Sequence, residues 1–481
     1  MVYFNENDLE VLYTVYGRIS LYILGCTSSV YDTERLGNLY TCDNSDKDVV
    51  ILGTCSLLDI QEKFSQWLVR VLRQLYPSSE LYAIGCDVCN NKDAYISNCD
   101  NIYTVNEVNS RVEGIYGDNV FEDRYNKIIL KIADGCCYKC SYCIINQLRA
   151  KPVYSRDYDD LYKELDTKLQ KYTNKVDVYL TGTEIGIYRD RQNKYDLVDL
   201  IDKISTDFKG RIGKIGVYSI DPGLPIIYKL IDYIGTHRDS CLTHFTISAQ
   251  YGNDSILESM KRRHKVKDLI AIHERAKENN VTLGWEIIVG YPGETEQTFE
   301  DTVKLIYKLK PVRNSLFIYS RRKGTVAYDM IDQVPEDIKK KRFDELIQIN
   351  KDMYSYYTHL QLDIMDRYGE SYNHYSVQRY TYDDSNLLNL LKNINVYDIS
   401  EFVKGINSIK RNSIIYIQYI KDKELELFFA IVFIRLKYGN DIWIKVDNID
   451  KDFIDCVYKL SSRNEIDIVG KIIKIKQKEK G

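Results

Sequence analysis

The stretch Ile132-Ala-Asp-Gly-Cys136-Cys137-Tyr-Lys-Cys140-Ser-Tyr142-Cys143 holds three cysteines in a C-x3-C-x2-C array. Three thiolates on one tight loop can ligate three irons of a [4Fe–4S] cube and leave the fourth iron open. An open iron can chelate S-adenosylmethionine, and an electron from the cluster then splits that molecule into methionine and a 5′-deoxyadenosyl radical. The alternative is a zinc knuckle, which usually brings a fourth Cys or a His at knuckle spacing. No His lies near the array in the sequence, so Cys136, Cys140 and Cys143 are predicted to ligate a [4Fe–4S] cluster.

The composition is typical of a globular protein. The chain has 481 residues, of which 44% are hydrophobic and 28% are charged, and this length corresponds to about three domains. There is no apolar run of 18 residues and no signal-peptide pattern at the start, so we expect no membrane span and a cytoplasmic location. Twelve cysteines in a reducing compartment would serve as ligands or buried thiols. A net charge of −4 means that any RNA contact would need a local basic surface.

Residues 1–118 alternate predicted strands and helices, which favours an α/β domain with a parallel sheet. The predicted strands are 18–24, 48–52 and 81–84, and the predicted helices are 31–40 and 59–75. One cysteine stands just past the end of each strand: Cys26, Cys55 and Cys86. Because parallel strands end at one edge of a sheet, we expect these thiols to converge.

The alternative for these three residues is a set of buried thiols, since free Cys packs well as a small apolar residue. The repeated placement after a strand predicts instead that Cys26, Cys55 and Cys86 ligate a second cluster. Three other cysteines lack this placement, and Cys89 would be the first substitute for Cys86: Cys42, Cys89 and Cys99.

Residues 124–366 continue as strand–helix units. Six predicted strands occur at 126–133, 176–181, 214–220, 244–249, 283–289 and 315–319, and a long helix occupies 336–366. Six such units predict a partial (β/α)6 barrel of the TIM type, with its chemistry at the carboxyl ends of the strands. The cysteine array falls at one of these ends.

Other loops at the same edge carry candidate ligand-binding residues. Thr183 and Glu184 follow the second strand, where the Glu184 carboxylate can receive the methionine ammonium of the cofactor. The next three strands end near Ser219, Gln250 and Gly290. A glycine there permits close approach of the backbone to a ligand. Taken singly, each loop is equally consistent with an ordinary structural turn, and only their order along the chain favours a site.

Residues 367–481 are predicted to form a small β-rich domain. The β-rich runs are 413–420, 425–436 and 441–446, followed by a strand-like basic tail at 468–478. From residue 401 to 481 there are 16 Lys and Arg against 12 Asp and Glu, which permits phosphate contact. The tail is equally consistent with a solvated edge strand whose lysines discourage aggregation.

These motifs, in this order, resemble the radical-SAM methylthiotransferases, which add methylthio groups to tRNA adenosines or to one ribosomal-protein aspartate. The resemblance covers roughly residues 18–345. It rests on the three strand-end cysteines, on Asp134 to Ile145 and on a set of shorter elements. These are Arg149 with Ser155-Arg156, Leu180-Thr-Gly182, Ser219-Ile-Asp-Pro222, Gln250 with Gly252, Met260-Lys-Arg262, the loop 290–296, and Tyr319-Ser-Arg321 with Gly324-Thr325.

The resemblance implies a role for each candidate residue. Cys136, Cys140 and Cys143 would hold the cofactor-splitting cluster, with Tyr142 against the adenine. Cys26, Cys55 and Cys86 would hold an auxiliary [4Fe–4S] cluster that carries the sulfur. Glu286 stands where the family usually has Asp. The residues implied to bind cofactor or line the active site are Tyr142, Thr183, Glu184, Ser219, Gln250, Arg262 and Gly290.

The implied function is methylthiolation of carbon 2 of a hypermodified adenosine (N6-threonylcarbamoyladenosine or prenyl-adenosine) beside the anticodon of tRNA. One S-adenosylmethionine would donate the methyl group and a second would supply the radical. The implied partners are the anticodon stem-loop, an electron donor such as flavodoxin or ferredoxin, and a sulfur donor, and we expect a monomer. The alternatives are a methylthiotransferase acting on a ribosomal-protein aspartate or a novel target, and a non-catalytic Fe–S or RNA-binding relative.

The chain departs from the family near both cysteine sets. Ser29 and Gly53 stand where Asn is common, Asn146 replaces a Pro, and Ala150 replaces a Gly. These changes bear on the handling of sulfur and substrate more than on the fold. The motif of the usual RNA-binding β-barrel is not found in residues 367–481, which leaves the partner of that region open.

Overall fold

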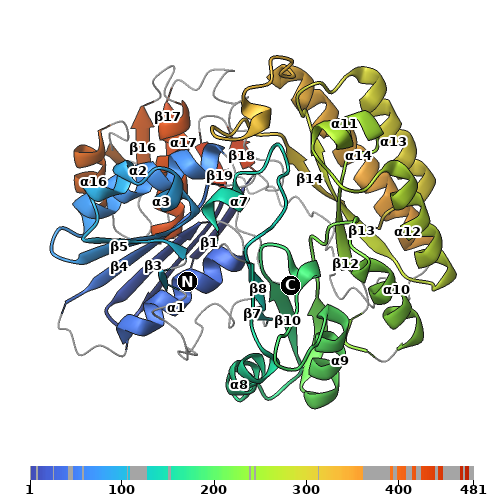
Figure 1. The fold of residues 1–481 in the computed structure, drawn as a ribbon. Coiled ribbons are helices and arrows are strands. Elements are labelled where there is room, and N and C mark those ends of the chain that lie inside the picture. The colour runs from blue at the N-terminus through green and yellow to red at the C-terminus, as the bar shows by residue number, and fades with distance from the viewer. Residues whose placement is uncertain are drawn as a thin grey trace. The chain divides into compact units, whose positions relative to one another are not determined.

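A computed structural model gives the structure of the chain (Figure 1). It describes residues 2–6, 9–24, 27–41, 47–56, 59–105, 107–108, 127–149, 153–237, 240–242, 245–312, 314–360, 391–393, 398–407, 414–418, 424–438, 443–447, 466–469 and 472–475. The chain forms two compact units, Met1–Gly117 together with Tyr372–Gly481, and Asp118–Ser371. The domain boundaries expected from the sequence, 1–118, 124–366 and 367–481, stay predictions.

The first unit contains a six-stranded sheet in the order β1-β2-β3-β4-β5-β6. Its strands are β1 (Val2–Glu6), β2 (Leu9–Tyr16), β3 (Ile19–Leu24), β4 (Val49–Thr54), β5 (Glu80–Gly85) and β6 (Asn101–Tyr103). The predicted strands β3, β4 and β5 are parallel neighbours, so the expected parallel sheet is confirmed. The hairpin of β1 and β2 was not predicted, and β2 pairs antiparallel with β3 across a turn in which Gly17 has φ 58°.

Two long helices follow the strands of this sheet, as predicted. They are α1 (Thr27–Thr41) after β3 and α2 (Asp59–Leu75) after β4. Along α2, apolar side chains recur at helical spacing and are buried: Phe64, Trp67, Leu68, Val71 and Leu72. This stripe gives the first unit its core, because an amphipathic helix is stabilised chiefly by burial of its apolar face.

The C-terminal part of the first unit is mixed α/β. It contains β15 (Leu391–Asn393), α16 (Ile399–Asn407), β16 (Ile414–Gln418), α17 (Glu424–Tyr438) and β17 (Trp443–Asp447). The prediction of a β-rich run at 425–436 was wrong, because these residues form α17. A continuous apolar run lacks the alternation of a half-buried strand and fits a buried helix equally well.

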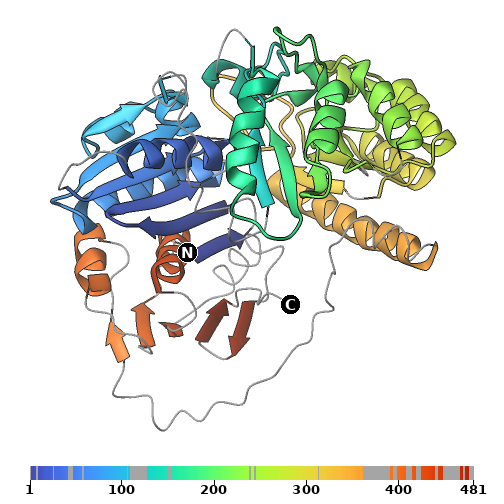
Figure 2. The ribbon, with the colours of Figure 1, turned by 90° about the horizontal axis from the view of Figure 1, so that it is seen from below.

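The basic tail also differs from its prediction as one strand. It forms two short antiparallel strands, β18 (Ile466–Val469) and β19 (Ile472–Ile475), in a sheet ordered β15-β16-β17-β19-β18. The lysine-containing β19 therefore lies between two strands, and β18 lies at one edge of the sheet. Figure 2 shows these strands together with α16 and α17.

The helices α16 and α17 share a core with the N-terminal sheet and α2. Phe402 of α16 and Phe429 and Phe433 of α17 are buried in the same cluster as Trp67. The ring centroids of Phe429 and Phe433 lie 5.8 and 6.1 Å from that of Trp67. Residues from the N-terminal and C-terminal parts of the first unit thus form one hydrophobic core.

The second unit contains six parallel strands in two sets of three. The sets are β7 (Lys127–Lys131), β10 (Val176–Thr181) and β11 (Ile212–Gly216), and β12 (Phe245–Gln250), β13 (Leu283–Val289) and β14 (Asn314–Ile318). A parallel bridge between Ile220 and Ile247 joins the sets. The order and direction of the six strands agree with the predicted strand–helix units, while closure as a (β/α)6 barrel stays a prediction.

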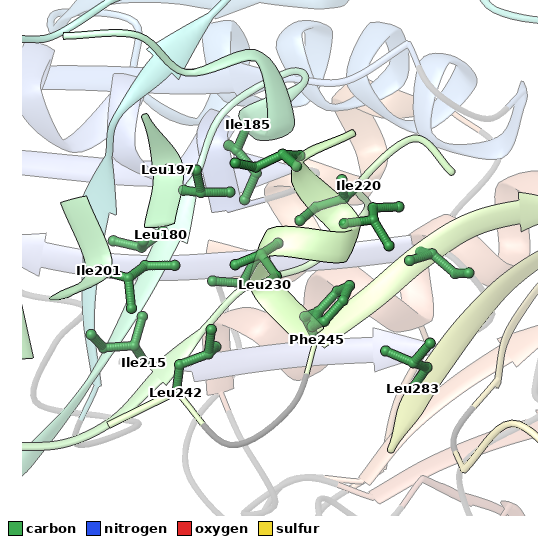
Figure 3. Packing of buried hydrophobic residues seen from close by; sticks show 14 of the residues in the cluster. Leu180, Ile185, Leu197, Ile201, Ile215, Ile220, Leu230, Leu242, Phe245 and Leu283 are labelled. Carbon is green, nitrogen blue, oxygen red and sulfur yellow. The ribbon is translucent and has the colours of Figure 1, made fainter. Parts of the chain in front are cut away.

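Helices connect these strands and cover them. They are α8 (Tyr158–Leu169), α9 (Leu197–Asp207), α10 (Ile226–Thr236), α12 (Val266–Glu278), α13 (Glu296–Leu309) and α14 (Glu336–Leu360). Figure 3 shows their packing, with Ile201 of α9 and Leu230 of α10 near Leu180, Ile215 and Phe245 of the strands. This core fixes the strand ends at which the predicted site lies. Within the described ranges, no helix is long and apolar enough to span a membrane.

Candidate active site

The cysteine array lies on the loop that follows β8 (Ala133–Asp134), at the carboxyl end of the first parallel strand of the second unit. Cys136, Cys140 and Cys143 are partly exposed and form no disulfide. The loop turns tightly, since the N–H of Cys143 donates to the carbonyl of Cys140 at 3.2 Å. Burial raises the pKa of the Cys136 thiol to about 12, and a bound metal would overcome this because coordination deprotonates a thiol outright.

The start of the loop is fixed by Asp134, a buried carboxylate between two cations. Its Oδ2 pairs with Lys131 Nζ at 2.6 Å, and its Oδ1 lies 3.6 Å from Arg149 Nη1. Oδ1 also accepts from Thr183 Oγ1 at 2.7 Å and from the N–H of Gly135 at 2.9 Å. Burial alone would raise the pKa of Asp134, but the neighbouring cations outweigh it and hold that pKa well below its usual range.

The far side of the loop is attached to three other segments of the second unit. Ser141 Oγ donates to the carbonyl of Ser259 at 2.8 Å and lies 2.7 Å from Tyr291 Oη. The N–H of Ser141 donates to the carbonyl of Met260 at 3.1 Å, and its own carbonyl accepts from Ala327 at 2.9 Å. The cysteine loop is therefore held at both ends by partners far away in the sequence.

Arg262 connects the cysteine loop to the strand ends. Its side chain is 4% exposed, and its guanidinium pairs with Asp221, Nη2 to Oδ2, at 2.8 Å. Nη2 donates to the carbonyl of Ser248 at 3.0 Å, while Nη1 donates to Cys140 Sγ at 3.3 Å and to Tyr142 Oη at 3.4 Å. Two predicted site residues, Arg262 and Tyr142, thus lie directly beside a predicted cluster ligand.

The loop after β10 holds Glu184 and Thr183 in different roles. Glu184 is buried, and its Oε1 accepts from the N–H of Gly186 at 3.0 Å. Burial raises the pKa of Glu184 to about 8, and repulsion from Asp221 adds to this shift. An arriving ammonium would favour the charged form, because an opposite charge lowers the pKa of a carboxyl. Thr183 instead braces Asp134.

Ser219 and Gln250 share an unusual backbone conformation, with φ of 64° and 63°. Residues other than Gly are uncommon in this left-handed region, and such strain gathers at functional sites. Gln250 is buried, and its Oε1 has no hydrogen-bond partner among the described residues. Ser219 Oγ donates to the Glu286 carboxylate, which also accepts from Ser248 Oγ at 2.7 Å. The Oε1 atom of Gln250 can therefore accept a hydrogen bond from a ligand.

Gly290 adopts φ 78° at the end of β13, and α14 covers it. A Cβ at this position would lie 2.3 Å from Lys339 Cγ, so only glycine fits. The N–H of Gly290 donates to Glu294 Oε2 at 2.8 Å, and Glu294 Oε1 pairs with Arg342 of α14 at 2.8 Å. The backbone at Gly290, where a close approach was expected, thus lies close to α14.

Sequence reasoning did not include Asp221, Tyr291 or Ser248 among the site residues, although each contacts one that was predicted. Asp221 lies inside the motif that begins at Ser219, and Tyr291 lies inside the glycine loop that begins at Gly290. Ser248 stands two residues before Gln250 in β12, but strand periodicity does not pair them, because the register of β12 shifts between Ile247 and Gln250. No signal in the sequence paired Asp221 with Arg262.

In the part of the chain that the structure describes, no three His, Cys, Asp or Glu side chains gather closely enough to hold a single metal ion. In a [4Fe–4S] cube each thiolate binds a different iron, so the ligands stand farther apart. Cys136, Cys140 and Cys143 supply the three thiols such a cube needs, and Gln250 leaves a buried oxygen unpaired near the same strand ends. The residues present fit a cluster with a bound small molecule.

In the first unit, Cys55 and Cys86 directly follow a pair of residues on neighbouring strands. Thr54 of β4 pairs with Gly85 of β5 in parallel register, so both cysteines stand at the same sheet edge. Both are buried and form no disulfide. Cys26, the third predicted ligand, lies outside the described residues, as does Cys42. Cys89 stands with Cys86 in the short helix α3 (Cys86–Asn90).

The structure explains one of the departures near these cysteines. A Cβ on Gly53 would lie 2.4 Å from Thr33 Oγ1 of α1, so the Asn common in the family does not fit here unless Thr33 moves. Thr33 Oγ1 donates to the carbonyl of Ser29 at 2.8 Å, and the buried Ser29 Oγ has no partner among the described residues. Ala150 lies outside the described residues, and Asn146 belongs to α7 (Ile145–Leu148).

Comparisons with known proteins identify a domain in the second unit. A family model for the radical SAM superfamily matches residues 130–306. The threonylcarbamoyladenosine tRNA methylthiotransferase MtaB of Thermotoga maritima is 25% identical over 68% of this chain and 81% of its own length. The ribosomal protein uS12 methylthiotransferase RimO of Natranaerobius thermophilus is 26% identical over 70% and 82%. The tRNA-2-methylthio-N(6)-dimethylallyladenosine synthase of Clostridium tetani is 30% identical over 50% and 51%.

The matched residues 130–306 contain the cysteine array, and membership in the radical SAM superfamily implies a [4Fe–4S] cluster and S-adenosylmethionine as cofactors. The names of all three relatives refer to methylthio groups, and two of the three alignments extend over more than two thirds of this chain. Residues 130–306 therefore form a radical SAM domain, and the chain is similar to methylthiotransferases over 68–70% of its length.

Proposed function

We propose that the protein installs a methylthio group on carbon 2 of a hypermodified adenosine, N6-threonylcarbamoyladenosine or prenyl-adenosine, beside the anticodon of tRNA. The observation that carries this proposal is the occurrence of two cysteine sets in one chain. One set is the array on the braced loop, and the other includes Cys55 and Cys86 after paired strand residues. Relatives named for both adenosines support tRNA as the substrate.

In the second unit, Cys136, Cys140 and Cys143 would hold the cluster that binds S-adenosylmethionine. When bound, the cluster and S-adenosylmethionine together would supply a 5′-deoxyadenosyl radical, which removes hydrogen from the target carbon. Glu184 would accept the cofactor ammonium, and Tyr142 would lie against its adenine. Further contacts are proposed for Thr183, Ser219, Gln250, Arg262 and Gly290, of which Thr183 and Gly290 also orient neighbouring segments.

In the first unit, Cys26, Cys55 and Cys86 would hold a second [4Fe–4S] cluster, which carries the sulfur to be methylated and transferred. The thiol and the backbone N–H of Cys55 both donate hydrogen bonds, and binding of iron would remove the thiol proton. Cys55 Sγ lies 2.9 Å from Gln61 Oε1, and its N–H donates to Ser65 Oγ at 3.3 Å. Burying such polar groups is costly unless they are paired.

The number of clusters is tested by iron and sulfide content after anaerobic reconstitution, with EPR spectra of the reduced protein. We expect about eight irons in the wild type and about four in the variant Cys26→Ala/Cys55→Ala/Cys86→Ala. Cys99→Ala is the matched control, because Cys99 also lies in the first unit but does not follow a strand of the sheet, and it should retain about eight. About four irons in wild type and triple variant alike would contradict the second cluster.

The substrate is tested by nucleoside analysis of tRNA from cells with and without the gene. Loss of a 2-methylthio adenosine in the deletion, restored by the wild-type gene but not by Cys140→Ala, is the expected result. An external electron donor such as flavodoxin or ferredoxin and a sulfur donor would be needed, and the enzyme is proposed to act as a monomer.

A ribosomal-protein aspartate is the second candidate substrate. It is favoured by the relative that acts on uS12 and by the C-terminal region, where α16 and α17 are buried against α2. That arrangement differs from the small RNA-binding β-barrel implied by the resemblance. An unchanged tRNA profile together with loss of a methylthio mass from a ribosomal protein would select this candidate.

A further inference from the structure

Arg262 is fixed beside the sulfur of Cys140 by contacts on both sides of its guanidinium. Asp221 Oδ2 lies 2.8 Å from Nη2, which also donates to the carbonyl of Ser248 at 3.0 Å. Nη1 faces the other way and donates to Cys140 Sγ at 3.3 Å. The planar guanidinium allows little freedom once two edges are held, so the donor to sulfur is preorganised.

The charge of Arg262 is retained although the side chain is buried. A guanidinium stays protonated in proteins, and the Asp221 carboxylate pairs with it at 2.8 Å. Arg262 Nε is buried without a hydrogen-bond partner among the described residues, so this cation has a donor to spare. A buried, fixed cation acts strongly on nearby charge, because solvent screens it little.

Reduction of a [4Fe–4S] cluster adds one negative charge, part of which resides on the sulfurs. Hydrogen bonds to the sulfurs are among the factors that set the reduction potential of such clusters. We infer that Arg262 is a positioning residue that raises the reduction potential of the cluster held by Cys136, Cys140 and Cys143. It does so by donating a charge-assisted hydrogen bond to Cys140 Sγ, which favours the reduced state. This inference rests on the proposed ligand set.

The neighbouring Arg263 provides a matched control. It also faces Asp221, at 3.6 Å, but its side chain is 45% exposed, and its guanidinium stacks on Tyr138 with 3.9 Å to the ring centroid. Its Nη2 donates to Tyr138 Oη at 2.6 Å. Among the described residues, Arg263 has no hydrogen bond to a cysteine of the array, so its removal changes the net charge equally without removing a donor to sulfur.

The experiment is a redox titration of the reconstituted full-length protein, followed by EPR. The signal that changes when S-adenosylmethionine is added identifies the cluster of interest. We expect Arg262→Gln to lower the midpoint potential, so that the ratio of reduced to oxidised cluster at a fixed poise falls about tenfold, which corresponds to about 59 mV for one electron. Arg262→Lys should give a smaller drop, because it keeps the charge but loses the rigid fork. Arg263→Gln should match the wild type.

Iron content, measured on the same samples, distinguishes a shifted reduction potential from loss of the cluster. An unshifted potential in Arg262→Gln with full iron content, or an equal drop in Arg263→Gln, would overturn the inference. If Arg262→Gln does not assemble the cluster, the midpoint potential of Arg262→Lys tests the inference. A potential in Arg262→Lys equal to that of the wild type would then overturn the inference. A shifted potential in an enzyme that leaves tRNA and ribosomal protein unmodified would contradict the proposed function alone.

Discussion

Asp134 neutralises two buried cations, Lys131 and Arg149, at the base of the cysteine loop. Asp134→Asn would remove the buried carboxylate that pairs with both cations. Removing one member of a buried ion pair costs about 3–5 kcal/mol, and we expect the free energy of unfolding to fall by about this amount. Denaturant unfolding of the second unit measures the loss, and iron content should fall as well because the loop loses its anchor.

The control for this change is Asp166→Asn. Asp166 pairs with Arg211 at 2.9 Å, but both side chains are more than a third exposed. Exposed ion pairs contribute about 0–1 kcal/mol, so this variant should unfold almost as the wild type does. Equal small losses in both variants would refute an anchoring role for Asp134.

Glu184 makes stability depend on pH in a defined direction. Its pKa is about 8 in the folded protein, against about 4.3 for an unfolded chain. The folded state therefore holds the proton more tightly, and this contribution to stability is complete below pH ~4.3 and lost as pH rises through 8. Glu184→Gln should unfold at a higher denaturant concentration than the wild type at pH 8 but not at pH 4.5.

The Glu184→Gln comparison is read from urea midpoints at the two pH values, in protein without cofactor. Glu300→Gln is the control, since Glu300 is 51% exposed on α13 and should give the same difference from the wild type at both pH values. A constant difference for Glu184→Gln as well would mean that its carboxyl is not buried in the neutral form.

At the scale of the elements, hydrophobic periodicity predicted the strands and helices with a clear pattern. β13 was predicted with its observed bounds, and α2 likewise. The alternation that marks a half-buried strand is absent from α17, where a continuous apolar run left strand and helix equally compatible. The hairpin β1–β2 was missed because it precedes the first strand with a strong pattern. Local sequence does not reveal which distant element a segment will cover.

The candidate site likewise contains residues that could be located from the sequence and partners that could not. Strand ends could be located from the sequence, so Cys136, Glu184 and Gln250 were assigned to one edge. The partners that hold them could not, because Arg262 and Asp221 meet across 41 positions of sequence through the tertiary fold. The same holds for α14, whose contact with the loop after β13 has no counterpart in the local pattern.

Helix α14 positions the glycine loop through Arg342, and this role can be measured. Glu294 is fully buried and pairs with Arg342, and it also accepts the N–H of Gly290. In Arg342→Ala the buried carboxylate loses its cation, so we expect a loss of about 3–5 kcal/mol in unfolding free energy. The Kd for S-adenosylmethionine should rise about tenfold, the equivalent of ~1.4 kcal/mol, because the loop loses its support.

Lys304→Ala on α13 is the control for α14, because its pair with Glu300 is exposed on both sides. Isothermal titration gives the Kd, and denaturant unfolding gives the stability. A destabilised Arg342→Ala protein that binds the cofactor as tightly as Lys304→Ala does would show that α14 supports the fold but not the loop.

At the scale of the whole molecule, the two cysteine sets belong to different units. The cysteine array lies in Asp118–Ser371, while Cys55 and Cys86 lie in the unit made by both ends of the chain. In that unit Phe433 of α17 stacks on Tyr22 at 6.2 Å and lies edge-on to Trp67. The C-terminal region therefore covers apolar surface of the N-terminal sheet, in addition to whatever partner it binds.

This shared core predicts that residues 1–117 require residues 372–481 in order to fold. Expressed alone, 1–117 would expose Trp67 and its neighbours, and we expect aggregation or loss of cooperative unfolding, because exposed apolar patches of this kind drive association. Co-expression with 372–481 should give a soluble complex that co-purifies. Phe433→Asp in the C-terminal fragment should abolish co-purification, since it buries a charge without a partner. Lys404→Asp, on the exposed face of α16, should leave the complex intact. A folded, monomeric 1–117 with the same unfolding midpoint alone and in complex would instead establish 367–481 as the separate domain that the sequence predicts.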